Sequence, residues 1–211
     1  MSVEKSPIAV IGAGGHAKVV IAALLANNLE VGDVFDDDDS KWGTSVHGFS
    51  VIGPIEAIRR TRYRRAVVAL GNNQHRREVA TDWDLEWQCV VHPAAWVDPT
   101  ADLGAGSVVF AGAIIQADAS IGRHVIVNTS SSVDHDCVLG DFVHVAPGAN
   151  LAGGVRVGEG SLLGIGSCVA PGINVGPWAT VGAGSTVVED VAAAVTVVGV
   201  PARPVCDECG P

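Results

Sequence analysis

His135 is the residue of this sequence best suited to general-base chemistry. The ordinary pKa of an imidazole lies near neutrality, so a well-placed histidine can accept a proton at physiological pH. Asp134 and Asp136 flank His135, and a carboxylate beside the ring would orient it and stabilise its protonated form. Neighbouring residues of an extended chain point to opposite faces, so both carboxylates can lie with His135 only if a corner intervenes.

A second histidine, His144, follows nine residues later. A lone histidine in such a segment is more often a surface residue, but two within a short, otherwise unreactive stretch favour a functional site. Together with His124 they could also bind a metal ion, although their spacing matches no familiar Cys/His site. We therefore expect no metal.

The N-terminal segment contains a glycine-rich turn, Gly12-Ala-Gly14-Gly-His-Ala17. An acidic residue, Asp36, follows about twenty positions later. This pattern satisfies the dinucleotide-binding fingerprint and would indicate NAD. However, residues 7–91 supply only half of a dinucleotide fold, and a histidine stands where a pyrophosphate would approach. We interpret the turn as a phosphate cradle for a smaller nucleotide ligand. A turn that only packs strand on helix is the alternative.

The elements that must position these residues differ between the two parts of the chain. Residues 7–11, 31–35, 65–70 and 89–91 are expected strands, and residues 18–26, 54–60 and 73–80 are expected helices. Their alternation predicts a Rossmann-like α/β domain with a parallel sheet, which binds ligands at the carboxyl ends of its strands. We place this domain at residues 1–92 and a second domain at residues 93–211.

The second domain has an unbroken period of six. An aliphatic residue occupies every sixth position from Val97 to Val187, sixteen positions in all. Such a fixed period predicts a parallel β-helix rather than a sandwich with irregular loops. Glycine often follows the aliphatic residue, and we expect it to supply the positive φ of the corners: the examples are Gly104, Gly122, Gly140, Gly158, Gly164, Gly176 and Gly182.

Composition excludes several classes of protein. The net charge is −10, and ten of the thirteen Lys and Arg residues precede residue 97. An acidic chain without long apolar runs predicts no nucleic-acid partner and no membrane span. The N-terminus lacks a secretory pattern, so we expect a cytoplasmic protein. Cys206 and Cys209 form a single C-x-x-C pair, which is weak support for zinc.

Three separated segments resemble one family. They are I-G-A-G-G-H-A (11–17), V-D-H-D-C-V-L-G-D-F-V-H-V-A-P-G-A (133–149) and V-G-V-P-A-R-P (198–204). The chain resembles the bacterial sugar acetyltransferases that include the bacillosamine-pathway and perosamine N-acetyltransferases and the sialic-acid O-acetyltransferase. The resemblance implies a left-handed β-helix, a homotrimer, acetyl-CoA in the groove between neighbouring β-helices, and a nucleotide-linked sugar held by the first domain.

The same resemblance implies roles for individual residues. His135 would be the catalytic base and Asp136 its acidic partner. Acetyl-CoA would contact His144, Gly153, Ile165 and Ala183. The acceptor would contact residues of both domains: Gly14, Gly15, His16, Asp36, Asp37, Gly71, Asn72 and Asn128.

Gly153 has a separate argument. It follows His135 by eighteen residues, so if three units make one coil it lies directly beside that histidine. Its backbone N–H could then stabilise the oxyanion of an acyl-transfer intermediate.

Our leading hypothesis is an acetyl-CoA-dependent N-acetyltransferase that acts on a nucleotide-linked 4-amino-4,6-dideoxy sugar in surface-glycan synthesis. O-acetylation of a sugar such as a sialic acid by the same His135 is the second hypothesis. A non-catalytic scaffold that senses a nucleotide and an NAD-dependent enzyme are the others. The sequence does not separate UDP, GDP and dTDP as the nucleotide.

Overall fold

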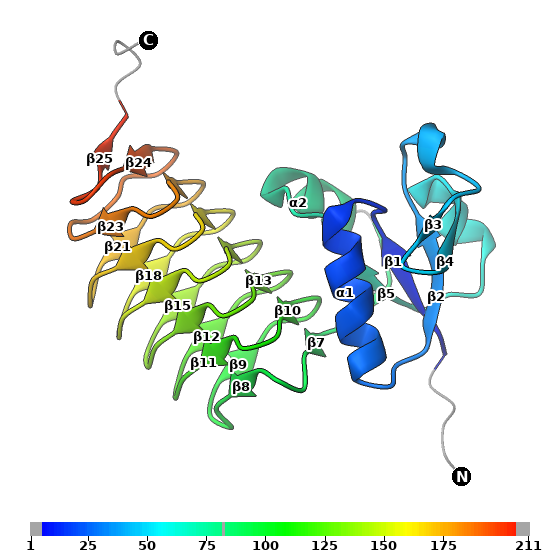
Figure 1. Ribbon diagram of the computed structural model, residues 1–211, viewed down its shortest axis with the longest axis horizontal. Helices are drawn as coiled ribbons and strands as arrows, with labels where there is room; N and C mark the ends of the chain where they lie inside the picture. The colour runs from blue at the N-terminus through cyan, green and yellow to red at the C-terminus, as the bar shows by residue number, and fades with distance from the viewer. Residues whose placement is uncertain (1–5, 82, 206–211) are drawn as a thin grey trace.

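The computed structural model describes residues 6–81 and 83–205. Two parts lie side by side: an α/β domain formed by the N-terminal segment, and a column of stacked coils (Figure 1). This arrangement confirms the predicted fold class, an α/β domain followed by a parallel β-helix. None of the described helices is long and apolar enough to cross a membrane.

The α/β domain is built on a six-stranded sheet with the order β3-β4-β2-β1-β5-β6. The central strand β1 pairs in parallel with β2 and β5, whereas β3 runs antiparallel to β4. Parallel neighbours require crossovers, which are made largely by helices. The elements are β1 (Ile8–Ile11), α1 (Gly15–Ala26), β2 (Val31–Phe35), η1 (Asp39–Lys41), β3 (Ser45–Val46), β4 (Phe49–Gly53), η2 (Ile55–Arg60), β5 (Arg65–Val68), α2 (Asn73–Thr81) and β6 (Glu86–Trp87).

The helix expected at residues 54–60 is present as the 3-10 helix η2, but the placement of one predicted strand is wrong. The strand expected at residues 89–91 is β7 (Val90–Val91), which pairs with β10 (Val108–Val109) of the coils instead of joining the first sheet. Its partner lies eighteen residues away, so β7 already follows the spacing of the coils. The division at residue 92 stays a prediction.

Three sheets form the walls of the β-helix, and their strands are parallel except for the last strand of the first wall, which is antiparallel to its neighbour. Strands of successive coils pair eighteen residues apart, as in Val108↔Ile126, except at the last coil, where Thr180 pairs with Thr196. The first wall contains β7, β10, β13 (Ile126–Val127), β16 (His144–Val145), β19 (Leu162–Leu163), β22 (Thr180–Val181), β24 (Thr196–Val198) and β25 (Arg203–Pro204). The second wall contains β8 (Trp96–Val97), β11 (Ile114–Ile115), β14 (Ser132–Val133), β17 (Asn150–Leu151), β20 (Cys168–Val169) and β23 (Thr186–Val187). The third wall contains β9 (Asp102–Leu103), β12 (Ser120–Ile121), β15 (Val138–Leu139), β18 (Arg156–Val157) and β21 (Asn174–Val175).

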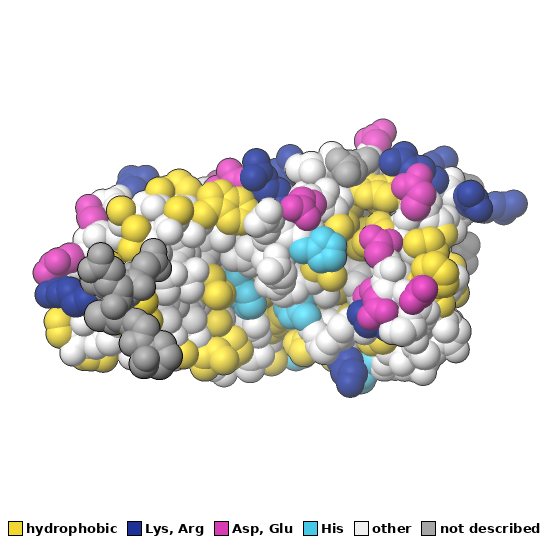
Figure 2. Space-filling model, turned by 90° about the horizontal axis from the view of Figure 1, so that it is seen from above, with side chains coloured by type: hydrophobic (Ala, Val, Ile, Leu, Met, Phe, Trp, Pro, Cys, Tyr) yellow, Lys and Arg dark blue, Asp and Glu magenta, His cyan; other side chains and the backbone are white. Residues whose placement is uncertain are grey.

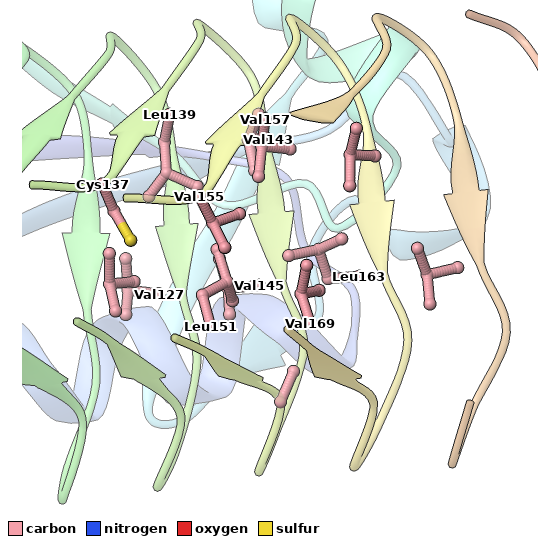
Figure 3. Packing of buried hydrophobic residues seen from close by; sticks show 14 of the residues in the cluster. Val127, Cys137, Leu139, Val143, Val145, Leu151, Val155, Val157, Leu163 and Val169 are labelled. Carbon is pink, nitrogen blue, oxygen red and sulfur yellow. The ribbon is translucent and has the colours of Figure 1, made fainter. Parts of the chain in front are cut away.

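The period of six is the period of the core. Every repeat aliphatic residue from Val109 to Val187 is buried, and side chains such as Val145, Leu151 and Leu163 point into the space between the walls (Figure 3). Stacking places each residue on its equivalent in the next coil, so the coils share one continuous apolar core. The coils therefore form a rigid column on which corner residues are placed at fixed intervals.

The expected role of the glycines was wrong in detail. The positive φ falls two residues after them, at Gly106, His124, Phe142, Gly160, Gly166, Trp178 and Gly184. The glycines of the predicted set are instead required by close packing between coils. At Gly140 a Cβ would lie 2.7 Å from the backbone nitrogen of Glu159.

The two parts share an apolar contact. Residues of α1, including Val20 and Leu24, belong to one buried cluster with Val108, Phe110 and Ile126 of the first wall. The α/β domain thus packs on the first coils through α1, which Figure 1 shows between the first sheet and the column. This contact brings the glycine-rich turn at the start of α1 toward the coils.

Candidate active site

The corner between β14 and β15 holds His135 and Asp136. Asp136 has φ +60, and this left-handed conformation forms the corner that the sequence required. The Nδ1 atom of His135 lies 2.7 Å from Oδ2 of Asp136. The backbone N–H of His135 donates to Oδ1 of Asp134 at 2.8 Å. With Nδ1–H directed to Asp136, Nε2 carries the lone pair that can accept a proton.

The surroundings favour a protonated His135. Its pKa is raised, first by the hydrogen bond to Asp136 and then by the negative charge of Asp134. The side chains of His135 and Asp136 are both exposed, so solvent screens this interaction. The pair can accept a proton from a reactant and hold it as an imidazolium.

Gly153 lies directly against this histidine in the next coil, as predicted from the eighteen-residue spacing. A Cβ at position 153 would lie 2.5 Å from Cε1 and 2.6 Å from Nε2 of His135. The carbonyl of His135 accepts a hydrogen bond from Gly154 at 2.9 Å, whereas the N–H of Gly153 donates to none of the described residues. That N–H is available to a ligand beside the ring.

A cavity of about 660 Å³ opens between α2 and the first wall of the coils. Ile165 and Ala183 line it on the coil side, and Gly71 and Asn72 line it on the side of the α/β domain. His144 lies between the two groups. The cavity thus collects five of the residues expected at the site. Figure 2 shows histidine side chains gathered in this region, where the two parts of the chain meet.

His144 and Asn128 form a pair at the cavity. Nδ2 of Asn128 lies 3.1 Å from Nε2 of His144. Burial first, and then the positive charge of Arg76, lower the pKa of His144 to about 3. His144 is therefore a neutral hydrogen-bonding group at physiological pH, unlike the exposed His135.

The glycine-rich turn approaches the same pair. Gly14 and Gly15 are exposed, and a Cβ at either position would meet nothing within 4 Å. The ring of His16 lies 6.3 Å from that of His144, centroid to centroid, and contacts Phe110 edge to face. Burial lowers the pKa of His16 to about 4. The open turn leaves room for a ligand in front of two neutral histidines.

Asp36 and Asp37 have protein partners. Asp36 accepts hydrogen bonds from the N–H of Ala13 at 2.6 Å and from Nζ of Lys41 at 3.1 Å. Burial raises the pKa of Asp36, but the hydrogen bonds from the N–H of Asp38, the N–H of Ala13 and Lys41 together hold it below its usual range. Asp37 accepts from the N–H of Ile55 at 2.9 Å. Asp36 therefore links the glycine-rich turn to the end of β2, and its role toward a ligand stays a prediction.

The candidate residues divide into two groups. His135, Asp136 and Gly153 lie at corners between the second and third walls, whereas the cavity with His144 lies on the first wall. Sequence reasoning missed Asn73 and Trp178, which also line the cavity. Trp178 could have been found, because most corners of the repeat carry glycine or a small polar residue. Asn73 carried no such signal.

No group of three or more His, Cys, Asp or Glu side chains that could hold a metal ion occurs in the part of the chain that the structure describes. The C-x-x-C pair of Cys206 and Cys209 lies outside the described residues.

Comparisons with known proteins agree with this architecture. Residues 7–83 match the PglD N-terminal domain family. The acetyltransferase domain of PglB from Neisseria gonorrhoeae is 41% identical with a TM-score of 0.90, over 95% of this chain and 100% of that domain. PerB from Caulobacter crescentus, solved with CoA and GDP-perosamine, is 40% identical with a TM-score of 0.90, over 98% of this chain and 100% of PerB.

Curated relatives match over shorter spans. The UDP-N-acetylbacillosamine N-acetyltransferase of Bacillus subtilis is 38% identical over 114 residues, which are 49% of this chain and 51% of the relative. The uncharacterized protein L142 of Acanthamoeba polyphaga mimivirus is 34% identical over 100 residues, 47% of this chain and 20% of the relative. The chain thus spans about half of one curated relative and a fifth of the other.

The fold and the site define the class of hexapeptide-repeat acyltransferases. Within that class, the chain belongs to the family of sugar acetyltransferases that join a PglD-type N-terminal domain to a β-helix.

Proposed function

We propose that this protein transfers the acetyl group of acetyl-CoA to the amine of a nucleotide-linked 4-amino-4,6-dideoxy sugar. The observation that carries the proposal is the His135–Asp136 pair beside the open N–H of Gly153. Solved structures of similar length support it, because the acetyltransferase domain of PglB was solved with acetyl coenzyme A and PerB with CoA and GDP-perosamine. Two PerB structures carry a replaced histidine. We assign the reaction to surface-glycan synthesis in the cytoplasm.

The residues present can carry out each proton transfer. The amine nitrogen attacks the thioester carbon, and Nε2 of His135 takes the proton that the nitrogen loses. Asp136 stabilises the imidazolium, and the N–H of Gly153 donates to the oxyanion. Collapse of the tetrahedral intermediate breaks the C–S bond. The proton held by His135 then passes to the departing thiolate, which restores the base.

We assign the cavity to acetyl-CoA on its coil side and to the acceptor on its α/β side. His144, Ile165 and Ala183 contact the donor in this proposal. The acceptor contacts lie at the glycine-rich turn, at the two loops that follow β2 and β5, and at the first wall: Gly14, Gly15, His16, Asp36, Asp37, Gly71, Asn72 and Asn128. Since His135 lies at a different corner from the cavity, we propose a homotrimer in which the base of one subunit faces the cavity of the next.

Thiol release from acetyl-CoA, measured against a panel of acceptors, tests this function. The panel contains UDP-, GDP- and dTDP-linked 4-amino sugars and the matching sugars that carry a hydroxyl at the same carbon. We expect turnover with at least one amine and none with the hydroxyl analogues. Turnover with hydroxyl acceptors alone would overturn amine specificity. Failure of every acceptor in the panel to increase thiol release would overturn acetyl transfer to a sugar.

A further inference from the structure

Arg76 of α2 is a fully buried arginine at the contact between the two parts of the chain. It is 1% exposed. Its guanidinium donates to the carbonyls of His124 at 2.8 Å and Phe142 at 2.7 Å, both on the coils. It also donates to the carbonyl of Leu70 at 3.0 Å, in the α/β domain. One side chain thus binds both parts of the molecule.

Asn73 extends this contact by one coil. Its Nδ2 donates to the carbonyl of Gly160 at 2.9 Å, and its Oδ1 accepts from Arg76 at 3.0 Å. The carbonyls of His124, Phe142 and Gly160 occupy the same corner of three successive coils, eighteen residues apart. α2 therefore binds a row of equivalent coil carbonyls, one after another.

These carbonyls are not part of the ladder that joins the coils. At this corner the ladder uses the preceding residue, as where the N–H of Phe142 donates to the carbonyl of Arg123 at 2.8 Å. The corner carbonyls are thus left for an outside donor. Planar guanidinium and amide groups supply several donors in fixed directions, so they select one alignment of α2 along the coils.

The contact also holds the loop that borders the cavity. Arg76 donates to the carbonyl of Gly71 at 3.4 Å, and Gly71 and Asn72 line the cavity opposite Ile165 and Ala183. Among the described residues no carboxylate forms an ion pair with Arg76. Burying a charge that has hydrogen bonds but no counter-ion costs desolvation free energy, so a contribution to stability alone does not explain this arginine. Alignment of the two parts is the better-supported role of such a group.

We propose that Arg76 and Asn73 are positioning residues that align the acceptor-binding α/β domain with the acetyl-CoA-binding coils. This inference depends on the proposed function for the identity of the two ligands. Neither residue takes part in proton transfer. Their contacts set the distance between the loop after β5 and the wall that carries His144. That distance determines how closely the amine can approach the thioester.

Two variants of Arg76 test the proposal. Arg76→Lys keeps the charge but loses the fork of donors, and Arg76→Met fills the space without a charge, which guards against misfolding from a buried unpaired charge. Arg59→Lys is the matched control, because Arg59 is exposed and pairs with its neighbour Glu56. The readouts are the acceptor KM, kcat, the acetyl-CoA dissociation constant, and amide hydrogen exchange in α2 and residues 70–72.

We expect both Arg76 variants to lower kcat/KM for the acceptor by roughly 10- to 100-fold, as for a misplacement of about 1 Å. Exchange should increase in α2 and residues 70–72 but not in the coils, and acetyl-CoA binding should stay within about twofold of wild type. Unchanged exchange and acceptor kinetics in both variants would overturn the proposal. If wild type transfers no acetyl group, the proposed function fails, and the exchange pattern still decides whether Arg76 aligns the domains.

Discussion

At the scale of residues, two histidines nine positions apart have opposite electrostatics. His135 is exposed at a corner where Asp136 raises its pKa, whereas burial and then the charge of Arg76 lower the pKa of the half-buried His144 to about 3. The sequence already favoured His135 as the base because of its flanking aspartates, but it could not predict the lowered pKa of His144, since burial and the charge of Arg76 depend on segments far away in the chain. This difference is why we assign proton transfer to His135.

The Asp136→Asn variant tests the acidic partner. Removing the carboxylate removes the main cause that raises the pKa of His135, so His135 becomes neutral, and hence active as a base, at lower pH. We expect the acid limb of the kcat/KM profile to shift to lower pH, with the plateau reduced by about 10-fold or more. An acid limb at the wild-type pH would contradict the assignment.

The Gly153→Val variant tests the open position beside the base. A Cβ there meets the His135 ring at 2.5 Å, so the ring must move. We expect kcat to fall at least about 10-fold while the melting temperature changes little, because the His135 ring that must move is exposed. Pro171 occupies the equivalent corner of the next coil, which shows that a side chain fits there when no histidine lies beside it. Wild-type activity would rule out the need for the open position.

At the scale of elements, the period of six predicted the coils because it reports the inward-facing residues directly. It did not locate the positive φ, since a glycine can be needed either for its dihedral angles or for lack of a Cβ, and composition does not separate the two. Residues 89–91 were assigned to the wrong sheet for a related reason. A short apolar strand has the same sequence pattern in the sheet of the α/β domain and in the first wall of the β-helix.

Two glycine variants separate these causes. Gly140→Ala places a methyl group 2.7 Å from backbone atoms of the next coil, and we expect a loss of about 1–3 kcal/mol in unfolding free energy. Gly148 has a φ of +66 and open space around it. Gly148→Asn should therefore lower the unfolding free energy by less than about 1 kcal/mol, because Asn tolerates that region. Urea denaturation measures both, and the opposite ranking would refute this interpretation.

At the scale of the whole molecule, the alignment of the two parts was not predictable. The two ends of the contact, Arg76 and the carbonyls of His124 and Phe142, are far apart in sequence, and backbone carbonyls carry no residue-type signal. The resemblance to the sugar acetyltransferases implied that the first domain holds the acceptor, and this placement stays a prediction.

The contact between the two parts should make stability sensitive to acid. Burial lowers the pKa of His16 and His124 to about 4 and that of His144 to about 3, from 6.5. As the pH falls below 6.5, the unfolded chain takes up protons that the folded protein does not, so stability falls between pH 6.5 and about 4. Melting temperatures across this range measure the effect.

His124→Phe provides the control for this pH dependence. The ring of His124 stacks on Phe142 and meets Trp87 edge to face, so a phenyl ring fits the same geometry without a titrating group. The variant should show a shallower decline of melting temperature with falling pH. A decline as steep as that of wild type would show that His124 does not contribute.

The most direct test of the account is transfer by His135→Ala, followed by mass spectrometry of the sugar nucleotide. We predict that wild type adds one acetyl group to the amine, and that the variant does so roughly 10²- to 10⁴-fold more slowly, the usual effect of losing a general base. Acetyl-CoA binding should be retained. Transfer by His135→Ala at the wild-type rate would contradict the central claim.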